Sequence, residues 1–454
     1  MKYRTDRDSL GGVKVPADAY YGAFTGRALK QYHVTGRTAH EHLISSFVMI
    51  KRAAAAANKK AGAIDAHRAD AIISACDLIL AGRHRDQFSV DMINSGAGTA
   101  FNMNANEVIA NVALHRILKK GRGRYEHLHP NDHVNMSQSS NDTYPTAMHM
   151  SILMNLNEAV PALRTLVGSL SAKAAEFAGF RKVGRTHLMD ALPVTLGGEF
   201  AAHATALSNA VDAVESTKKA LRFVALGGTA VGTGANTPRG YRSAAVAELA
   251  RISGLGLKPE RDMQYGLQSR AAVAATSGAL RNLALEMGRL ANDIRLMASG
   301  PVAGLAEIGI PAVHAGSSIM PGKVNPSLAE CMNMVCFEII GNDATVAYAA
   351  HAGQFELNVM LPVMLNSVLE STDMIKRFVP IFAANLIDGL VANGEKLQQY
   401  IEESPVIVTL LAPKIGYIRA ADLFKKSIKT GRTIRDLAVS EDIITEREFD
   451  ALLK

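Results

Sequence analysis

The sequence predicts a mostly α-helical protein whose helices are unusually long. Over three separate stretches, apolar residues recur at alternating steps of three and four, the spacing that places them along one face of a helix. Each stretch continues for more than two heptads, which is typical of rods packed side by side at shallow angles. Strand signals are short, the best lying at Lys182 to Val183 and Ile308 to Val313. We therefore expect a central bundle of long helices.

Three apolar stripes define the helices of this bundle. The first passes straight through Pro161, which indicates one kinked but continuous helix rather than two. Apolar faces this long are hard to bury within a single copy of the chain, so we expect a homo-oligomer with a shared helical core. The stripes are Ile152, Leu156, Ala159, Leu163, Leu166 and Leu170; Leu280, Leu283, Met287, Leu290, Ile294 and Met297; and Leu361, Leu365, Val368, Thr372, Ile375 and Val379.

We divide the chain into three domains, with edges where the long helices begin and end. At roughly 150 residues per domain, 454 residues suggest about this number. Residues 1–135 are expected to form an N-terminal, mainly helical domain, residues 136–389 the central bundle, and residues 390–454 a small C-terminal helical domain.

The composition excludes several classes of protein. With 48% hydrophobic and 20% charged residues, the chain has enough apolar surface for a folded core, which rules out disorder. Lysine and arginine number 49 against 42 acidic residues, and the densest basic runs carry no interleaved aromatic residues to stack on bases. No apolar run reaches the roughly 18 residues of a membrane-spanning helix. We expect neither a nucleic-acid partner nor a membrane span.

The N-terminus and the cysteines indicate the cytoplasm. Residues 1–8 alternate charged and polar groups and contain no apolar segment of a secretory signal. The cysteines, Cys76, Cys331 and Cys336, are too scattered for a disulfide framework or a zinc site. A reducing, cytoplasmic location is therefore expected.

Two glycine-containing segments do not qualify as nucleotide-binding loops. Between Gly316 and Gly322 stand five residues, and valine follows Lys323, whereas a P-loop needs four residues and a Ser or Thr. Gly232 and Gly234 lack the third glycine of a dinucleotide fingerprint. We expect no nucleotide cofactor.

Four polar, hydroxyl-rich segments interrupt the apolar rods. Their carboxylates and histidines never fall at metal-ligand spacing, so we expect no metal and no cofactor. They offer hydroxyls, amides, helix N-termini and one lysine, which suit a small substrate with carboxylate groups. The segments and their candidate residues are Ser95–Glu107 with Thr99; His129–Pro145 with Ser139, Ser140 and Asn141; Gly184–Pro193 with Thr186 and His187; and Gly316–Pro326 with Ser317, Lys323 and Asn325.

Each segment also has a purely structural interpretation. Residues 139–142 precede a helix and are of the types that favour its N-cap. Ser327 and Glu330 form S-x-x-E, the pattern of a capping box. His187, taken alone, is interpreted as a buried histidine with its hydrogen bonds satisfied. No segment establishes a function by itself.

Together and in this order, the four segments resemble the aspartase/fumarase superfamily. Its signature, G-S-S-x-M-P-x-K-x-N-P, stands intact at residues 316–326, and a chance match to its fixed positions is very improbable. VNMSQSSND and GRTHLMD are similar to the aspartase and class II fumarase branch rather than to argininosuccinate or adenylosuccinate lyases. The resemblance extends from VPADAYYG at residues 15–22 to the C-terminal domain, and it implies a homotetramer whose active sites are each assembled from three subunits.

The resemblance implies a reaction that releases fumarate from a succinate-like substrate through an aci-carboxylate intermediate. Such chemistry needs a strong base and donors aimed at the developing charge. By position in the signature, Ser317 matches the catalytic base, His187 the histidine near the substrate and Glu330 the acid that orients it. The remaining matches are substrate contacts: Lys323 and Asn325, which hold the charged carboxylate, and Thr99, Ser139, Ser140, Asn141 and Thr186.

The leaving group divides the branch into ammonia-lyases acting on aspartate and hydratases acting on malate. VPADAYYG, GAGTAFNMNANEVIANVAL, VNMSQ and AGQFELNVM resemble the aspartase side, so we predict elimination of ammonia from L-aspartate. The pair Ser139-Ser140 and HPNDH resemble the fumarase side. Val302, Leu361, Gly198 and the segment 261–275 depart from the family pattern, which leaves a lyase for a modified amino acid open. An inactive structural homologue is the alternative from another class.

Overall fold

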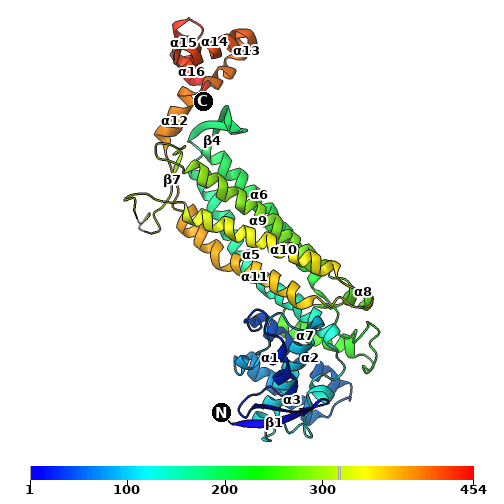
Figure 1. The fold of residues 1–454 in the computed structure, drawn as a ribbon. Coiled ribbons are helices and arrows are strands. Elements are labelled where there is room, and N and C mark those ends of the chain that lie inside the picture. Colours follow the sequence, from blue (N-terminus) through cyan, green and yellow to red (C-terminus); the bar gives the residue numbers. More distant parts are fainter. Residues whose placement is uncertain (1, 315, 317–318, 454) are drawn as a thin grey trace. The chain divides into compact units, whose positions relative to one another are not determined.

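The computed structural model describes residues 2–314, 316 and 319–453. The chain is mostly α-helical, as predicted, with short two-stranded sheets between the helices (Figure 1). It divides into two compact units: the first comprises Met1–Val160, Asp212–Asn282 and Phe337–Lys376, and the second Pro161–Val211, Leu283–Cys336 and Arg377–Lys454. The proposed division into three domains at residues 135 and 389 stays a prediction.

The first unit begins with an antiparallel hairpin and is otherwise mainly helical, with one short parallel pair of strands, β5 and β6. Strand β1 pairs with β2 from Tyr3 opposite Pro16 to Asp8 opposite Gly11, and Val13 and Val15 pack against Ala23. The sequence did not predict this hairpin, because β1 lacks the apolar alternation of a half-buried strand. The elements complete within the unit are β1 (Tyr3–Asp8), β2 (Gly11–Pro16), α1 (Ala23–Gln31), α2 (Glu41–Lys60), α3 (Ala66–Leu80), η1 (Arg85–Gln87), η2 (Gly96–Gly98), α4 (Thr99–Val112), η3 (Ala113–Ile117), η4 (Pro130–Val134), β5 (Phe223–Val224), α7 (Tyr241–Ser253), β6 (Lys258–Pro259) and α8 (Met263–Gln268).

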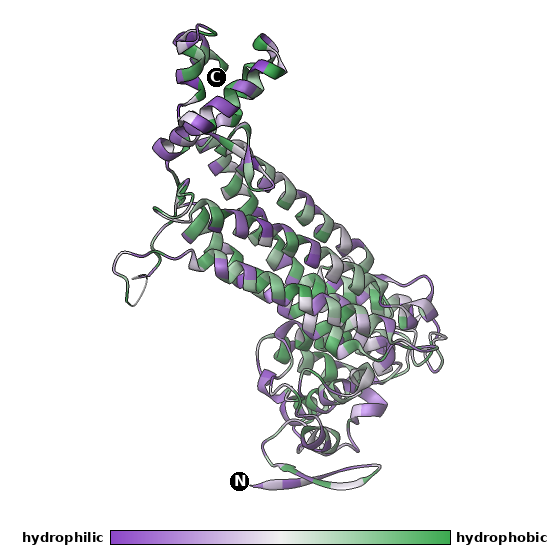
Figure 2. Cartoon of the chain, turned by 45° about the horizontal axis from the view of Figure 1, so that its top comes forward, coloured by the Kyte–Doolittle hydropathy of each residue, from purple (hydrophilic) through white to green (hydrophobic). Residues whose placement is uncertain are grey.

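Longer helices contribute residues to both units. They are α5 (Ser140–Glu176), α6 (Leu196–Leu221), α9 (Ala271–Met297), α10 (Ser327–His351) and α11 (Leu361–Phe382). Within the second unit their segments lie side by side as a bundle (Figure 1), and each carries both hydrophobic and hydrophilic residues, as an amphipathic helix requires (Figure 2).

All three predicted apolar stripes are buried. No residue in them is more than 6% exposed. Helix α5 has 37 residues and runs without a break through Pro161, which confirms the interpretation of one continuous helix. Proline removes one helical hydrogen bond and its ring crowds the carbonyl four residues earlier, so packing of the apolar face on both sides of Pro161 must offset this cost.

The second unit also carries the short strands and the C-terminal helices. The strand predicted at Lys182 to Val183 is confirmed, since β3 contains both residues. The strand predicted over Ile308 to Val313 is confirmed only for its first two residues, which form β7. Around Leu423, Leu437 and Phe449 the C-terminal helices form a separate small core. The elements complete within this unit are β3 (Arg181–Thr186), β4 (Met189–Thr195), β7 (Ile308–Gly309), η5 (Ala383–Ile387), β8 (Val391–Ala392), α12 (Gly394–Glu403), η6 (Pro405–Leu410), α13 (Ala412–Ile415), α14 (Tyr417–Thr430), α15 (Ile434–Ser440) and α16 (Glu446–Leu452).

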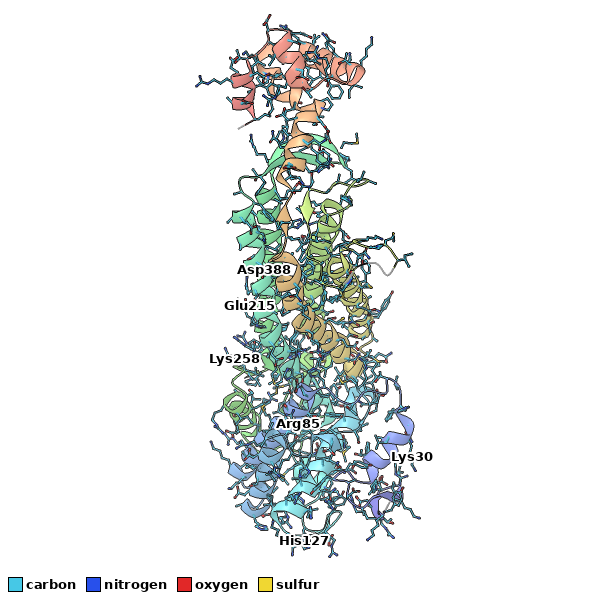
Figure 3. All side chains as sticks on the ribbon, turned by 90° about the vertical axis from the view of Figure 1, so that its left-hand side faces the viewer. Lys30, Arg85, His127, Glu215, Lys258 and Asp388 are labelled. Carbon is cyan, nitrogen blue, oxygen red and sulfur yellow. The ribbon has the colours of Figure 1, made fainter. Side chains whose placement is uncertain are left out.

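Charged side chains of both signs lie on the surface. In the first unit, Lys30, Lys258 and Glu215 are exposed (Figure 3). Within the part of the chain that the structure describes, no helix is long and apolar enough to cross a membrane.

Candidate active site

The predicted residues of the first two polar segments meet in the first unit. Thr99 is the first residue of α4 and Ser140 the first of α5, and their hydroxyl oxygens lie 3.0 Å apart. The two helices approach closely here because Gly98 has no side chain: a Cβ at this position would overlap the ring of Tyr144. The left-handed backbone of Gly98, at φ 64°, also favours glycine.

Ser139 and Asp142 cap α5 reciprocally. The Ser139 hydroxyl accepts a hydrogen bond from the Asn141 N–H at 3.2 Å, and the Asp142 carboxylate accepts one from the Ser139 N–H at 2.9 Å. The capping interpretation is therefore confirmed for these two residues. Ser140 and Asn141 point elsewhere, Ser140 to Thr99 and Asn141 through its Nδ2, which donates to the Ala230 carbonyl at 2.9 Å.

The carboxylate of Asp142 also reaches a glycine-rich loop far along the chain. Its Oδ2 accepts from the N–H groups of Gly227 and Thr229, each at 3.0 Å. Both residues have positive φ, 91° and 55°. Asp142 is fully buried, and burial raises its pKa to about 6, against the lowering effect of the three N–H bonds and of Lys51.

Lys51 of α2 lies fully buried in the same region. Its Nζ donates to Asn102 Oδ1 at 2.7 Å and to Asn135 Oδ1 at 2.9 Å. The Thr143 hydroxyl contacts Asn102 Oδ1 at 3.3 Å and donates to the Ser139 carbonyl at 2.8 Å. Burial lowers the pKa of Lys51 to about 7, while Asp142 acts in the opposite direction. Lys51 thus connects α4 to the start of α5 through polar groups.

Thr186 and His187 stand at the tip of the β3–β4 hairpin in the second unit. Thr186 pairs with Met189, so His187 and Leu188 form a two-residue turn. Their φ angles are 55° and 60°, the geometry of a type I′ turn, which usually contains Asn and Gly. Thr186 and His187 are exposed within this chain. The interpretation of His187 as a buried histidine is therefore wrong, because a hairpin tip has no packing partner in its own unit.

A buried ionic cluster lies beneath this hairpin. Lys182 Nζ is 2.6 Å from Glu307 Oε2 and 2.8 Å from Glu199 Oε2, and Arg185 Nη1 is 2.7 Å from Glu307 Oε1. The side chains of Lys182 and Glu307 are 3% and 0% exposed, a burial that is tolerated because each charge is paired. The cluster joins β3 to the segment that leads toward the signature loop.

The signature residues line a cavity of about 940 Å³ in the second unit. Lys323, Asn325 and Glu330 all contribute to its wall, together with Arg295. Ser317 lies outside the described residues. Gly316, at φ 77°, could not carry a Cβ without overlapping the Lys323 carbonyl, so glycine is required where the two ends of the loop meet.

Ser327 does not form the expected capping box. Its hydroxyl lies 3.0 Å from His314 Nε2 and contacts the Asn325 carbonyl at 3.5 Å. The Glu330 N–H donates to the Pro326 carbonyl, so Pro326 stands at the position just before the helix. The prediction fails because the helix begins one residue earlier than the pattern assumes, so that Ser327 is the first helical residue and not the N-cap. The side chain of Glu330 is therefore not used in a capping box, and Glu330 lines the cavity.

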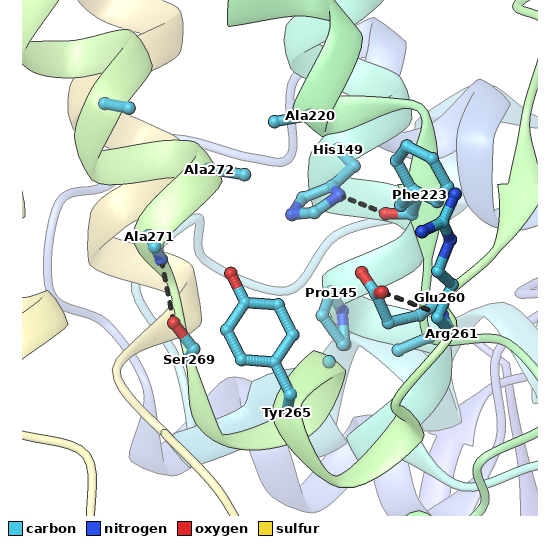
Figure 4. A pocket seen from close by; sticks show the side chains of 13 residues that line it. Pro145, His149, Ala220, Phe223, Glu260, Arg261, Tyr265, Ser269, Ala271 and Ala272 are labelled. Carbon is cyan, nitrogen blue, oxygen red and sulfur yellow. Dashed lines mark hydrogen bonds between the residues drawn. The ribbon is translucent and has the colours of Figure 1, made fainter.

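The departures from the family pattern have different surroundings. Val302 is 94% exposed and Leu361 fully buried. Much of the departing segment 261–275 lines a cavity of about 630 Å³ in the first unit, opposite His149 (Figure 4). This cavity was not predicted from the sequence, although the departure of segment 261–275 from the family pattern was a signal.

His149 is a half-buried polar group in the wall of this second cavity. Its Nδ1 lies 2.9 Å from the Phe223 carbonyl, and burial together with the charge of Arg270 lowers its pKa to about 4. The imidazole is therefore neutral at pH 7 and donates from Nδ1, since a carbonyl can only accept. Glu260, Arg261, Tyr265 and Ser269 supply further polar groups (Figure 4).

The structure thus gathers the candidates into two groups. Within the described residues, no group of three or more His, Cys, Asp or Glu side chains is placed to hold a metal ion. Thr99, Ser139, Ser140 and Asn141 lie in the first unit, and Thr186, His187, Lys323, Asn325 and Glu330 in the second.

Comparison with known proteins gives a consistent result. The family model described as "Lyase" matches residues 11–341, and that described as "Fumarase C C-terminus" matches residues 407–454. An aspartate ammonia-lyase from Bacillus sp is 42% identical over 450 residues, which cover 99% of this chain and 96% of the relative. A class II fumarate hydratase from Corynebacterium efficiens is 44% identical over 460 residues, which cover 100% and 96%.

The solved structures include a fumarate lyase:delta crystallin from Brucella melitensis bound to cobalt. Its TM-score to this chain is 0.96 at 42% identity, and the match covers 100% of this chain and 98% of that one. The predicted fold class is thereby confirmed over the whole length.

Proposed function

Because this chain belongs to the aspartase/fumarase superfamily of lyases, we propose that it eliminates ammonia from L-aspartate to give fumarate. The observation that carries the proposal is the set of hydroxyl and amide groups at the start of α5, where Thr99 and Ser140 are in contact. A helix N-terminus with such donors binds a carboxylate well. The sequence stretches that resemble aspartase favour ammonia over water as the leaving group.

Lys323 and Asn325 are proposed to hold the carboxylate on which the negative charge develops. Both line the cavity of the second unit. A lysine supplies a compact positive charge and an asparagine supplies N–H donors. Such groups stabilise an aci-carboxylate more than the ground-state carboxylate, which is what accelerates the reaction.

Ser317 is proposed as the base. In the elimination it takes the proton from the carbon beside the carboxylate, the electrons of that C–H bond move into the carboxylate, and their return forms the double bond as the C–N bond breaks. Neutral ammonia departs with the electrons of that bond, since the ammonium nitrogen already carries its protons. His187 and Glu330 are proposed to act near the substrate, with Glu330 orienting the histidine.

The site is proposed to be assembled from three subunits of a homotetramer. Thr186 and His187 are exposed at a hairpin tip within this chain, and the predicted contacts of the first unit lie on different elements. Exposed, backbone-constrained residues of this kind suit a site completed by another copy of the chain.

A class II fumarase is the second candidate, because Ser140 is the serine of the fumarase pattern. A hydroxyl leaves as hydroxide unless an acid protonates it, so malate requires a proton donor that an ammonium group does not. One methyl group shifts discrimination by only about 1–3 kcal/mol, so Ser140 alone does not exclude aspartate.

Fumarate formation from L-aspartate and L-malate, followed by ultraviolet absorbance with identical enzyme, tests the proposal. Formation from aspartate alone supports the ammonia-lyase. Formation from malate alone overturns it in favour of the hydratase. Silence with both substrates overturns both assignments and directs attention to a substituted aspartate and to the segment 261–275.

A further inference from the structure

Asp142 is a buried carboxylate whose hydrogen bonds, among the residues that the structure describes, come from main-chain N–H groups. One oxygen accepts from the Ser139 N–H at 2.9 Å and the other from Gly227 and Thr229 at 3.0 Å each. These donors come from positions up to 87 residues away. A single side chain therefore fixes the N-cap of α5 and a distant loop to the same point.

The parts that Asp142 fastens are those that carry candidate substrate contacts. Ser139 and the next residue, Ser140, stand at the N-cap and the first turn of α5. Asn141 donates to the Ala230 carbonyl at the end of the same loop. A shift of the loop away from Asp142 would therefore remove the partner that orients Asn141.

A neutral side chain could not make these contacts equally well. Three N–H donors converge on the two oxygens, and a carboxylate has four lone-pair positions to receive them. The amide of asparagine would turn an NH₂ group toward at least one N–H. Lys51 on α2, which bonds to Asn102 and Asn135, favours the ionised carboxylate and offsets part of the cost of burying its charge.

We propose that Asp142 is a positioning residue of the substrate site: its carboxylate fixes the start of α5 to the loop 227–229 and thereby sets where Ser140 and Asn141 present their polar groups. The inference rests on the proposed function in one respect only, namely that these two residues contact the substrate. Asp142 itself touches no substrate atom.

The test compares Asp142→Asn with Glu107→Gln. Glu107 is a matched control, because it is a buried carboxylate, 4% exposed, that also accepts from three main-chain N–H groups: those of Gly22, Phe24 and Thr25. None of these belongs to the candidate site. Each change preserves size and removes one charge, so a loss of general stability affects both variants.

In Asp142→Asn we expect KM for the substrate to rise about tenfold or more while kcat stays within about threefold, because a positioned binding group has been lost. Glu107→Gln should leave KM within about twofold of the wild type. Equal changes in KM for the two variants, or an unchanged KM in Asp142→Asn, would overturn the inference.

Amide hydrogen exchange of the full-length protein provides a readout that needs no turnover. In Asp142→Asn the amides of Ser139, Gly227 and Thr229 should exchange about tenfold faster or more, and in Glu107→Gln they should not. Unchanged protection at these amides overturns the inference even when the substrate is unknown. If the enzyme consumes malate and not aspartate, the proposed function fails, and the KM comparison is made with malate.

Discussion

The two groups of candidate residues are built in opposite ways. In the first unit, Ser139 caps a long helix through the Asn141 N–H. Ser140 and Asn141, which begin that helix, have hydrogen-bond partners on other segments of the chain, Thr99 and Ala230. In the second, Thr186 and His187 stand exposed on a hairpin turn, and Lys323 lies on a glycine-containing loop. The first group is therefore held ready by its own chain. In the second, strand pairing holds the backbone of the hairpin, while the exposed side chains of Thr186 and His187 remain available to a substrate or another subunit.

The largest effect is expected from removal of the proposed base, because this change tests the second group of candidate residues without altering the first. Ser317→Ala should lower kcat by about 10³-fold, within the range for loss of a proton-transferring group. Steady-state fumarate formation checks this result. Ser327→Ala, which removes a hydroxyl bonded to His314 at the end of the same loop, should retain activity within about tenfold. Wild-type kcat in Ser317→Ala would show that the base lies elsewhere.

The buried ionic cluster beneath the hairpin can be disrupted by substitution of Glu307. Because Glu307→Ala leaves the Lys182 ammonium buried without its closest partner, we expect a loss of about 3 kcal/mol in the free energy of unfolding. Urea denaturation measures it. Glu199→Ala removes the other partner of the same lysine, but its side chain is 32% exposed, so water can replace it. An equal loss in both variants would contradict the role of burial.

The dependence of stability on acid pH tests the surroundings of His149, which lines the cavity of the first unit. The pKa of His149 is lowered to about 4 in the folded chain, against about 6.5 when unfolded. The unfolded state therefore binds the extra proton first as pH falls, and stability declines from pH 6.5 toward 4. Between pH 7 and 5 this amounts to about 2 kcal/mol. His149→Gln should lose that much less over the same interval in urea titrations at both pH values.

The smallest expected effect concerns the hairpin turn itself. Leu188 has φ 60° and is 74% exposed, so its side chain strains the backbone without packing in its own unit. Leu188→Gly should raise the free energy of unfolding by about 1 kcal/mol. Leu188→Ala keeps the Cβ and should bring no gain. Thermal unfolding at equal protein concentration distinguishes the two, and a gain in both would attribute the effect to the apolar side chain.

The features that were predictable from sequence are those with a local pattern. The stripe from Ile152 to Leu170 repeats at helical spacing, so its burial and its continuity through Pro161 followed from neighbours in the chain. The cap at Ser139 was visible for the same reason. The signature at residues 316–326 indicated the family because its fixed positions all lie within one short segment of the sequence.

What the sequence could not predict depends on partners far apart in the chain. Asp142 meets a loop 85 residues later, and Lys182 meets Glu307 after 125 residues. No spacing rule links such positions. His187 was misjudged because its residue type says nothing about whether a turn lifts it away from the core. The roles of Ser317, Lys323 and Asn325 stay predictions.

The contacts of Asp142 have a consequence for how this scaffold can be altered. They use main-chain N–H groups, which every amino acid except proline possesses, so exchange of a side chain at Thr229 cannot delete them. The support that Asp142 provides is thus independent of the side chains of Ser140 and Asn141, which we propose to contact the substrate. A mutant library that randomises Ser140 and Asn141 while keeping Asp142 would vary recognition on an unchanged support, and new substrate preferences should be reachable by few substitutions.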